Sequence, residues 1–403
     1  MGELLPLPAC GTSPREFGGS LPLLVQIKNT RIKVATSFRF FDMWSKHHSF
    51  LDVVNESWRQ DTGLTGMNNL QVKLSRLSKR LQWWNKSVFG NVFNNVKRAE
   101  ASVAQAQKDW DHNPIQVHNI YLKKCIADLT QTEKIEEEFW RQKAAIRWVN
   151  EGERNTKYFH SIVQKKRSRG RIFSIEENGA LLTEPQALKE SGNRFFAKLF
   201  SNDVENLTYS ELNELKPLPP EVNLYELCDY PTSEDIKKAL FDMNSESTAG
   251  PDGYSAAFYQ KCWSIVQLDV VEAILDFFDG NIMPQSFTTT TIVLIPKVTH
   301  PKAWTDFRPI SLCNVINKLI SKILNDRLAK LLPLLIAPTQ SGFVKDRWIS
   351  DNILLAQELI HDIDQDWTHM NVALKLDMAK AYDRVQWKFL YQVLERMGFR
   401  AVD

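Results

Sequence analysis

The longest helical pattern in the sequence lies between residues 67 and 148. Pro114 interrupts it, and a second amphipathic stretch covers about residues 116–149. Because proline cannot continue the interior of a helix, we predict two long helices that form an antiparallel hairpin. In the first half, apolar residues recur at every third or fourth position and so share one helical face; they are Leu70, Leu74, Leu77, Leu81 and Trp84.

Shorter patterns follow along the rest of the chain. Residues 172–175 and 180–182 are apolar segments on either side of Asn178-Gly179, a preferred turn sequence of β-hairpins. A β-branched run over residues 289–295 predicts a buried strand that ends at Pro296, with residues 307–312 as its partner. Helical periodicity predicts further helices over approximately residues 185–199, 233–243, 255–278, 315–332, 349–363 and 385–397.

Strict alternation of apolar and polar residues is clearest just before Asp377. Val372, Leu374 and Leu376 alternate with less apolar neighbours, which predicts a strand with one buried face that ends at Asp377. A carboxylate fixed at the end of a strand suits Mg²⁺. On spacing alone, however, Asp377 is more simply interpreted as the cap of the helix that follows.

Five short strings occur in one order over about 140 residues. They are Ser247-Thr-Ala-Gly-Pro-Asp-Gly253, Ile295-Pro-Lys297, Asp306-Phe-Arg-Pro-Ile-Ser-Leu312, Gln340-Ser-Gly-Phe343 and Leu376-Asp-Met-Ala-Lys-Ala-Tyr-Asp-Arg-Val385. Together they resemble the reverse transcriptases of LINE-type (non-LTR) retrotransposons, especially those of plants. One string alone is a weak signal, whereas five in order are very specific.

The resemblance implies an α+β fold in which a helical hairpin linker precedes the fingers and the first palm strand of a right-hand polymerase. The palm is expected to be incomplete, since its later motifs are missing. The implied organisation is a disordered leader over residues 1–24, a remnant of the endonuclease C-terminus over 25–60, a helical linker over 62–170, and the first part of the reverse transcriptase domain over 171–403.

The resemblance also assigns roles to particular residues. Asp377 is the implied catalytic residue and ligand of Mg²⁺, together with the carbonyl of Met378, and Tyr382 occupies the position that excludes a ribose 2′-hydroxyl. Lys297 and Arg308 are implied to hold the triphosphate of the incoming deoxynucleotide. The implied partners are an RNA template and a DNA primer. The alternatives are a packed aromatic for Tyr382 and ordinary surface cations for Lys297 and Arg308.

The sequence departs from the family in two respects. It contains no Asp-Asp dipeptide, whereas nucleotidyl transfer needs two metal ions held by several carboxylates. Residues 18–22 read Gly-Gly-Ser-Leu-Pro where the endonuclease carries Ser-Asp-His, so we expect no endonuclease activity and poor order for the aromatics of residues 38–58. We therefore expect a truncated, inactive polymerase fragment; the alternatives are a catalytically dead nucleic-acid-binding remnant and a functionless pseudogene product.

Composition adds a candidate binding surface. The net charge of the chain is only +2, but residues 139–171 hold ten Lys and Arg against two Asp and Glu. A basic run beside Tyr158 and Phe159 suits a phosphate backbone with stacked bases, although such a run is otherwise a solvated loop. Its candidate nucleic-acid-binding residues are Lys165, Lys166, Arg167, Arg169 and Arg171.

Other classes of site are not supported by the pattern. The five cysteines are scattered without a Cys-x-x-Cys pair, and the histidines show no ligand spacing, so we expect no zinc. No apolar run is long enough for a membrane span, and the N-terminus lacks a basic region of the kind that begins a secretion signal. These features predict a protein of the nucleus or cytoplasm.

Overall fold

The computed structural model describes residues 37–144, 156–201, 230–361, 372–376 and 385–399, with a few isolated positions between them. The chain divides into two units, residues 1–37 and 38–403, and every described helix and strand belongs to the second. The predicted leader, Asp377, Met378 and Tyr382 lie outside the described residues. No helix in the described part is long and apolar enough to cross a membrane.

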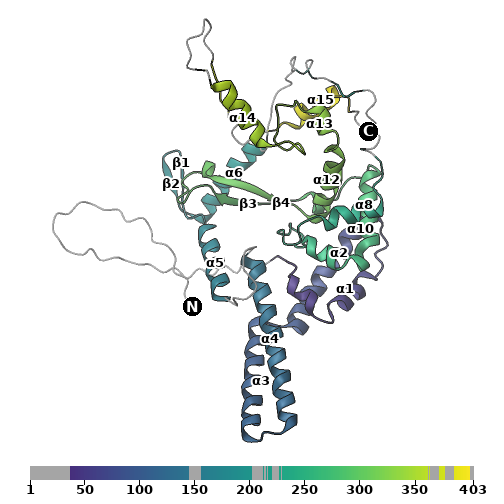
Figure 1. Ribbon diagram of the computed structural model, residues 1–403, viewed down its shortest axis with the longest axis vertical. Coiled ribbons are helices and arrows are strands. Elements are labelled where there is room, and N and C mark those ends of the chain that lie inside the picture. The colour runs from purple at the N-terminus through teal and green to yellow at the C-terminus, as the bar shows by residue number, and fades with distance from the viewer. Residues whose placement is uncertain are drawn as a thin grey trace, which may run out of the picture. The chain divides into compact units, whose positions relative to one another are not determined.

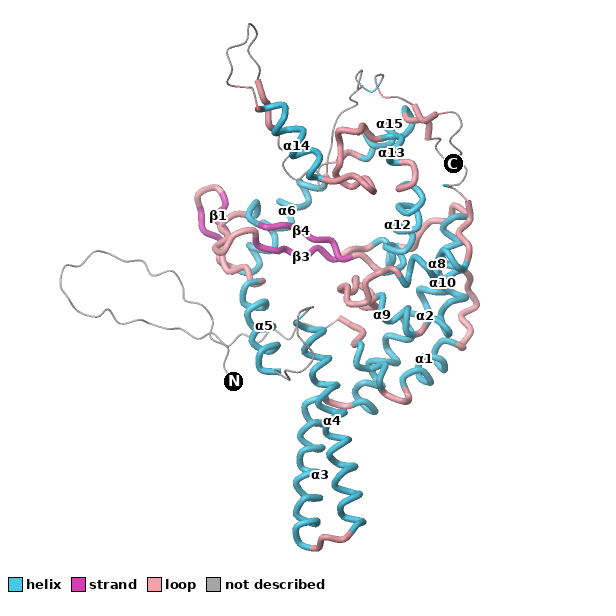
Figure 2. The backbone as a smooth tube through the Cα atoms, viewed as in Figure 1, coloured by secondary structure: helices cyan, strands magenta, loops and turns pink. Residues whose placement is uncertain are grey.

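Mixed helices and small two-stranded sheets make up the described chain (Figures 1 and 2). The N-terminal half is helical except for one β-hairpin: η1 (Asp42–Lys46), α1 (Phe50–Trp58), α2 (Gly66–Trp84), η2 (Asn85–Phe89), α3 (Val92–His112), α4 (Gln116–Ala144), α5 (Thr156–Arg169), β1 (Ile175–Glu177), β2 (Ala180–Leu182) and α6 (Pro185–Phe200). The second half contains α8 (Ser233–Phe241), α9 (Ala256–Lys261), α10 (Trp263–Phe278), α11 (Gln285–Thr288), β3 (Thr291–Pro296), η4 (Trp304–Asp306), β4 (Phe307–Leu312), α12 (Val315–Leu328), α13 (Leu332–Leu335), α14 (Ile349–Ile360) and α15 (Trp387–Arg396).

The main core is built by helices that are distant in sequence. The predicted stripe on α2 is confirmed, since Leu70, Leu77 and Leu81 are fully buried there. This stripe packs against α10, and the same core includes apolar side chains of α8, α9 and α12. Burial of this stripe is worth about 1.5–3 kcal/mol for each large side chain, so α2 is held by tertiary packing rather than by helix propensity alone.

The aromatics of residues 38–58 belong to this core. We expected them to lack packing partners and to be poorly ordered, and this expectation is wrong. Phe40, Trp44 and Phe50 are at most 2% exposed. Phe40 lies edge-on to Phe258, with 5.4 Å between ring centroids, and its backbone N–H donates to the carbonyl oxygen of Gly253 at 2.9 Å. Their packing partners include Phe258, which lies far along the chain, and Trp84 of α2.

The predicted helical hairpin is confirmed as α3 and α4, which pack side by side (Figure 1). Their seam buries Ala106, Leu122 and Cys125. The sequence pattern did not indicate that the first helix is interrupted: α2 gives way to the π-helical turn η2, and Gly90 then takes the left-handed φ of +79°. This break separates the hairpin from the helix α2 of the main core.

Both predicted β-hairpins form. In β1–β2, Asn178 and Gly179 take φ values of +51° and +78°, which is the type I′ turn that an Asn-Gly pair favours. Strands β3 and β4 pair antiparallel. The prediction that the first of them is buried is wrong, because Ile292, Val293 and Ile295 are each at least 40% exposed. The apolar residues of β3 are therefore not all buried within the described chain.

The predicted strand before Asp377 does not form. Residues 372–376 have no regular structure in the described chain, and Val372, Leu374 and Leu376 are about four-fifths exposed or more. Alternation gives a strand one apolar face, but a strand is stable only when a neighbouring strand pairs with its backbone and another layer covers that face. The described residues supply neither for this segment.

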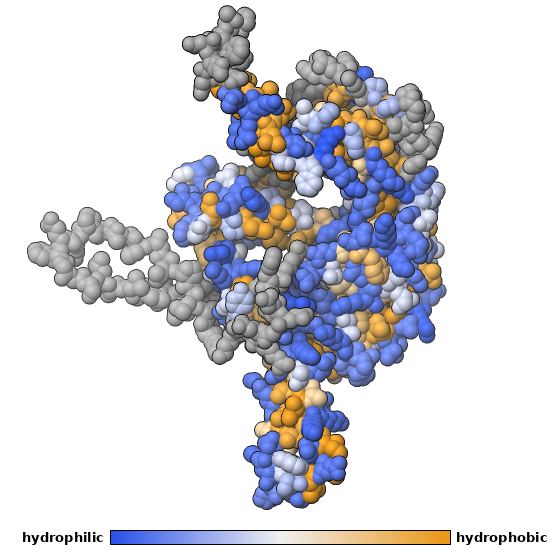
Figure 3. Space-filling model, in the orientation of Figure 1, coloured by the Kyte–Doolittle hydropathy of each residue, from blue (hydrophilic) through white to orange (hydrophobic). Residues whose placement is uncertain are grey.

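Apolar side chains are also exposed on two helices. Figure 3 shows apolar surface on the outer part of the α3–α4 hairpin and on α14. In the hairpin, Val117 and Ile120 are more than 60% exposed, and on α14 Leu354 and Leu359 are too. The predicted helix over residues 349–363 thus exists, but it ends at Ile360 and buries no residue.

Candidate nucleotide and nucleic-acid interface

The β3–β4 hairpin brings the two predicted triphosphate ligands to one face. Ile295 and Arg308 are register partners. Lys297 lies one residue beyond β3, and its N–H donates to the carbonyl oxygen of Asp306 at 2.7 Å, which extends the ladder by one step. Alternate residues of a strand share a face and so do register partners. Lys297 and Arg308 are therefore diagonal neighbours on the same face, and both are exposed.

The connection between the two strands is fixed by Asp306. Its carboxylate accepts hydrogen bonds from the backbone N–H groups of Lys302 and Ala303 at 2.9 and 3.0 Å. The hydrogen bond from Ala303 and then that from Lys302 lower the pKa of Asp306, because they stabilise the charged form. The ammonium group of Lys297 donates to the carbonyl oxygen of Thr305 at 2.9 Å. Hydrogen bonds among its own residues thus fix the conformation of the loop.

A second small core supports this hairpin. Trp304 and Phe307 are buried against Ile175 of β1 and Phe196 of α6. The indole N–H of Trp304 donates to the hydroxyl of Ser191 at 2.8 Å. Gly192 allows α6 to lie close to the indole, because a Cβ there would be 3.0 Å from the ring. The hairpin that carries Lys297 and Arg308 is therefore supported by packing against β1 and α6.

The motif over residues 247–253 forms a structural junction. Asn314 is fully buried and accepts a hydrogen bond from the N–H of Asp252 at 3.1 Å, while it donates to the carbonyl oxygen of Ser286 at 2.6 Å. Gly250 must be glycine, since a Cβ would lie 2.3 Å from the side-chain oxygen of Asn314. Asn314 was not singled out from the sequence; its position two residues beyond Leu312, where the third string ends, was the only signal.

Asp252 in this junction is electrostatically unusual. Burial raises its pKa to about 6, against a hydrogen bond from the N–H of Tyr254 and the charge of Lys318, which act in the opposite direction. Its Oδ2 is buried and accepts no hydrogen bond from the described residues. A carboxylate in such surroundings costs stability when it is ionised.

The predicted basic surface lies on helix α5 and not on a loop. Its apolar residues Phe159 and Val163 are buried against the end of α4, so Phe159 cannot stack on a base and that part of the prediction is wrong. Lys165 and Arg169 are exposed on the helix. The ammonium group of Lys166 donates to the carbonyl oxygen of Ala144, at the end of the described α4.

Of the remaining predicted residues of this surface, one is described in the structure and one is described only in its backbone. Arg171 follows α5 and is exposed, whereas the side chain of Arg167 lies outside the described residues. Tyr158 is 49% exposed and remains accessible for stacking. Helix α5 therefore presents the exposed cations Lys165 and Arg169 outside its packed face.

The segment Gln340–Phe343 is irregular, as predicted, and a residue outside it fixes its shape. The guanidinium of Arg347 donates to four carbonyl oxygens, those of Pro333, Ile336, Ala337 and Gln340, at 2.6–3.3 Å. Arg347 thereby caps α13 and closes the loop around it. Phe343 takes a φ of +64°. Arg347 was not identified from the sequence, because hydrogen bonds to carbonyl oxygens leave no sequence pattern.

The metal-binding prediction falls on Asp377 and Met378, outside the described residues. Within the described part, no three His, Cys, Asp or Glu side chains gather in a way that could hold a metal ion. Within the described residues, the candidate interface therefore consists of the cationic hairpin, its supporting core and the basic helix.

Comparison with known proteins identifies a family that matches part of the chain. Residues 295–402 match the family described as reverse transcriptase (RNA-dependent DNA polymerase). This match begins at the end of β3 and includes Lys297, Arg308 and Asp377.

Curated relatives are transposon proteins. The chain is 25% identical over 386 residues to the Transposon TX1 uncharacterized 149 kDa protein of Xenopus laevis, which covers 92% of this chain and 29% of that protein. It is 28% identical over 167 residues to the Retrovirus-related Pol polyprotein from type-2 retrotransposable element R2DM of Drosophila melanogaster, covering 41% of this chain and 15% of the relative.

A third relative is the Retrovirus-related Pol polyprotein from type-1 retrotransposable element R2 of Popillia japonica, 29% identical over 119 residues, or 29% of this chain and 16% of the relative. The chain thus spans less than a third of each of these three proteins. The family match over residues 295–402 and these relatives support the resemblance of this chain to the reverse transcriptases of LINE-type (non-LTR) retrotransposons.

Proposed function

We propose that this chain is part of a retrotransposon RNA-directed DNA polymerase, in which the β3–β4 hairpin forms the fingers that receive a deoxynucleoside triphosphate. One observation carries the proposal: Lys297 and Arg308 are diagonal neighbours on an exposed face of a supported hairpin, within the region that matches the family. Arg308 can bind phosphate oxygens bidentately and Lys297 acts as a compact charge. RNA template and DNA primer are the proposed partners.

The proposed catalytic centre is Asp377, with the carbonyl oxygen of Met378 and with Tyr382 beside the sugar. When bound, Mg²⁺ ions activate the primer hydroxyl and neutralise the triphosphate. Asp377 follows an exposed segment, and the sequence offers no Asp-Asp dipeptide as further ligand. We therefore propose that these 403 residues do not by themselves complete a two-metal site.

We expect the purified chain to show no primer extension on an RNA template with Mg²⁺ or Mn²⁺. The reaction uses two metal ions about 3.5–4 Å apart, and one carboxylate supplies too few ligands to hold both. The measurement is incorporation of labelled deoxynucleotides, with Asp377→Ala as the background control. Incorporation above that control would contradict the proposed inactivity and leave the family assignment intact.

A catalytically inactive nucleic-acid-binding role is the second candidate, and the exposed cations of α5 favour it. Each lost phosphate contact on single strands lowers the slope of log affinity against log salt by about 0.7. Replacing Lys165, Lys166, Arg167 and Arg169 by Ala should therefore flatten the slope by up to about 3 units if all four contact phosphate. The measurement is RNA affinity as a function of salt concentration.

Two controls make this measurement specific. Replacing Lys297 and Arg308 by Ala should change the salt slope of RNA binding far less, since we propose that these two cations bind a triphosphate. A four-residue variant of exposed hairpin cations, Lys97, Arg98, Lys123 and Lys124 to Ala, removes the same charge elsewhere. If the hairpin variant and the α5 variant change the slope equally, only net charge matters. If the Lys297/Arg308 variant changes the slope more than the α5 variant does, RNA binds at β3–β4.

A further inference from the structure

A small cavity lined by polar and charged residues lies between segments that the proposed function does not use. Its volume is about 50 Å³, enough for about three or four water-sized occupants. It is bordered by η1, by α4 and by the residues around the 247–253 junction. The lining residues are Asp42, Glu138, Arg141, Gln142, Ser245, Glu246, Ser247 and Ser255.

Three oxygen atoms of these lining residues are buried without a hydrogen bond from the described chain: Asp42 Oδ1, Glu138 Oε2 and Ser255 Oγ. Ser255 itself is only 4% exposed. Buried polar atoms are almost always satisfied, by protein, by water or by an ion. Carboxylate oxygens accept but do not donate, so the cavity requires a donor or a cation.

The surrounding contacts fix the lining in place. The N–H of Asp42 donates to the amide oxygen of Gln142 at 3.0 Å, and the amide nitrogen of Gln142 donates to the carbonyl oxygen of Phe40 at 3.1 Å. The amide of Gln142 therefore holds η1 against α4 and leaves the carboxylates facing the cavity. Burial raises the pKa of Asp42, with Lys261 opposing it and Glu138 adding to it.

Charge limits the kind of cation. The other oxygen of Glu138 forms an ion pair with Lys46, and the ammonium of Lys261 is 4.0 Å from Asp42 Oδ1. Arg141 and Glu246 also line the cavity with opposite charges. Because the carboxylates are already largely balanced, a divalent ion would leave a large positive excess. All-oxygen ligands suit hard cations.

We propose that this cavity binds a monovalent alkali cation, with Asp42 Oδ1, Glu138 Oε2 and Ser255 Oγ as its protein ligands. One such ion satisfies several acceptor oxygens at once, whereas each water molecule donates only two hydrogens. The ion joins η1, the base of the α3–α4 hairpin through α4, and the N-cap of α9. The site is independent of the proposed polymerase function.

Thermal unfolding tests the proposal. At a constant ionic strength of about 0.15 M, we expect the midpoint of the full chain to be higher by on the order of 2–4 °C in KCl or NaCl than in choline chloride. Choline is too large for the cavity. The two alkali salts distinguish potassium from sodium. Equal midpoints in all three salts would overturn the proposal and leave water as the occupant.

Substitution locates the effect. Ser255→Ala removes one ligand and should abolish most of the difference between alkali and choline salts. The matched control is Ser57→Ala, another serine that is 4% exposed and has an unpartnered hydroxyl, but does not line this cavity. An alkali effect that survives Ser255→Ala, or that is lost equally in Ser57→Ala, would show that the ion does not bind here.

A direct measurement does not depend on any variant. Crystals of the unmodified chain grown in RbCl should give an anomalous difference peak inside the cavity, next to Asp42, Glu138 and Ser255. Rubidium replaces potassium with little change in chemistry. An anomalous map without a peak at this position would overturn the proposal, whatever the unfolding data show.

Discussion

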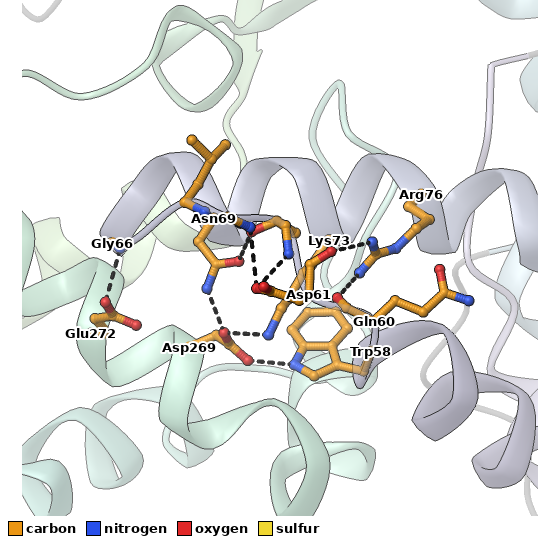
Figure 4. Close-up of polar contacts among 12 residues, drawn as sticks. Trp58, Gln60, Asp61, Gly66, Asn69, Lys73, Arg76, Asp269 and Glu272 are labelled. Carbon is orange, nitrogen blue, oxygen red and sulfur yellow. Dashed lines mark hydrogen bonds and ion pairs between the residues drawn. The ribbon is translucent and has the colours of Figure 1, made fainter.

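Replacing Asp269 by Ala is expected to lower the free energy of unfolding by about 3–5 kcal/mol. This carboxylate of α10 is 9% exposed and accepts three hydrogen bonds from other helices. Its donors are the indole N–H of Trp58 at 2.6 Å, the amide of Asn69 at 2.7 Å and the ammonium of Lys73 at 2.6 Å. Figure 4 shows these donors converging on Asp269 from α1 and α2.

The large effect comes from the groups that remain after the substitution. Without Asp269, the ammonium of Lys73 stays in a site where its side chain is only 15% exposed. An unpaired charge and two unpaired N–H donors then carry their full desolvation penalty. The contact also joins α1 and α2 to α10, about 200 residues apart in the sequence, so its loss affects the assembly of the main core.

Urea unfolding of the wild type and the variants provides the measurement. Asp326→Ala is the matched control, since Asp326 pairs with Lys322 on the surface of α12 and such pairs contribute about 0–1 kcal/mol. A Lys73→Met change combined with Asp269→Ala should cost less than the sum of the two single changes, because the unpaired charge is gone. A loss for Asp269→Ala no larger than that for Asp326→Ala would contradict the assigned role.

Asp252→Asn is expected to stabilise the chain at neutral pH, by up to about 3 kcal/mol. The pKa of Asp252 is raised from 3.8 to about 6 in the folded chain. The native state therefore binds this proton more tightly than the unfolded state, and the ionised carboxylate opposes folding. As the pH rises from about 4 to about 6, wild-type stability should fall relative to that of the variant and then remain level.

Asparagine preserves the local geometry at this position. The hydrogen bond from the N–H of Tyr254 to Asp252 Oδ1, 3.0 Å long, can be kept by the amide oxygen. The measurement is the difference in unfolding free energy between wild type and variant across about pH 3–8, a range that brackets both pKa values. Asp306→Asn is a control of opposite sign, because the pKa of Asp306 is lowered by hydrogen bonds, so its ionised form stabilises the fold. A pH-independent difference for Asp252→Asn would contradict the prediction.

Local patterns in the sequence were sufficient to predict most of the helices and strands. The stripe on α2, the turn at Pro114 between α3 and α4, the Asn178-Gly179 turn and the pairing of β3 with β4 were all predicted and are confirmed. The ordered motifs also indicated the resemblance to LINE-type reverse transcriptases, which the comparisons support. Most of these features depend on residues within a few positions of one another, where backbone preference and apolar period act directly; β3 and β4 pair across a connection of only ten residues. The plant-like origin and the roles of Lys297, Arg308 and Asp377 stay predictions.

Tertiary structure decided which patterns are buried and which polar residues meet. Phe40 and Trp44 were expected to lack a core and are among the most buried residues, whereas the apolar faces of β3 and of residues 372–376 are exposed. Asp269, Asn314 and Arg347 acquired their roles only through partners elsewhere in the chain. An apolar pattern indicates that a face can be buried, but burial requires another segment to cover that face. Which segment covers it is a long-range property that no local spacing encodes.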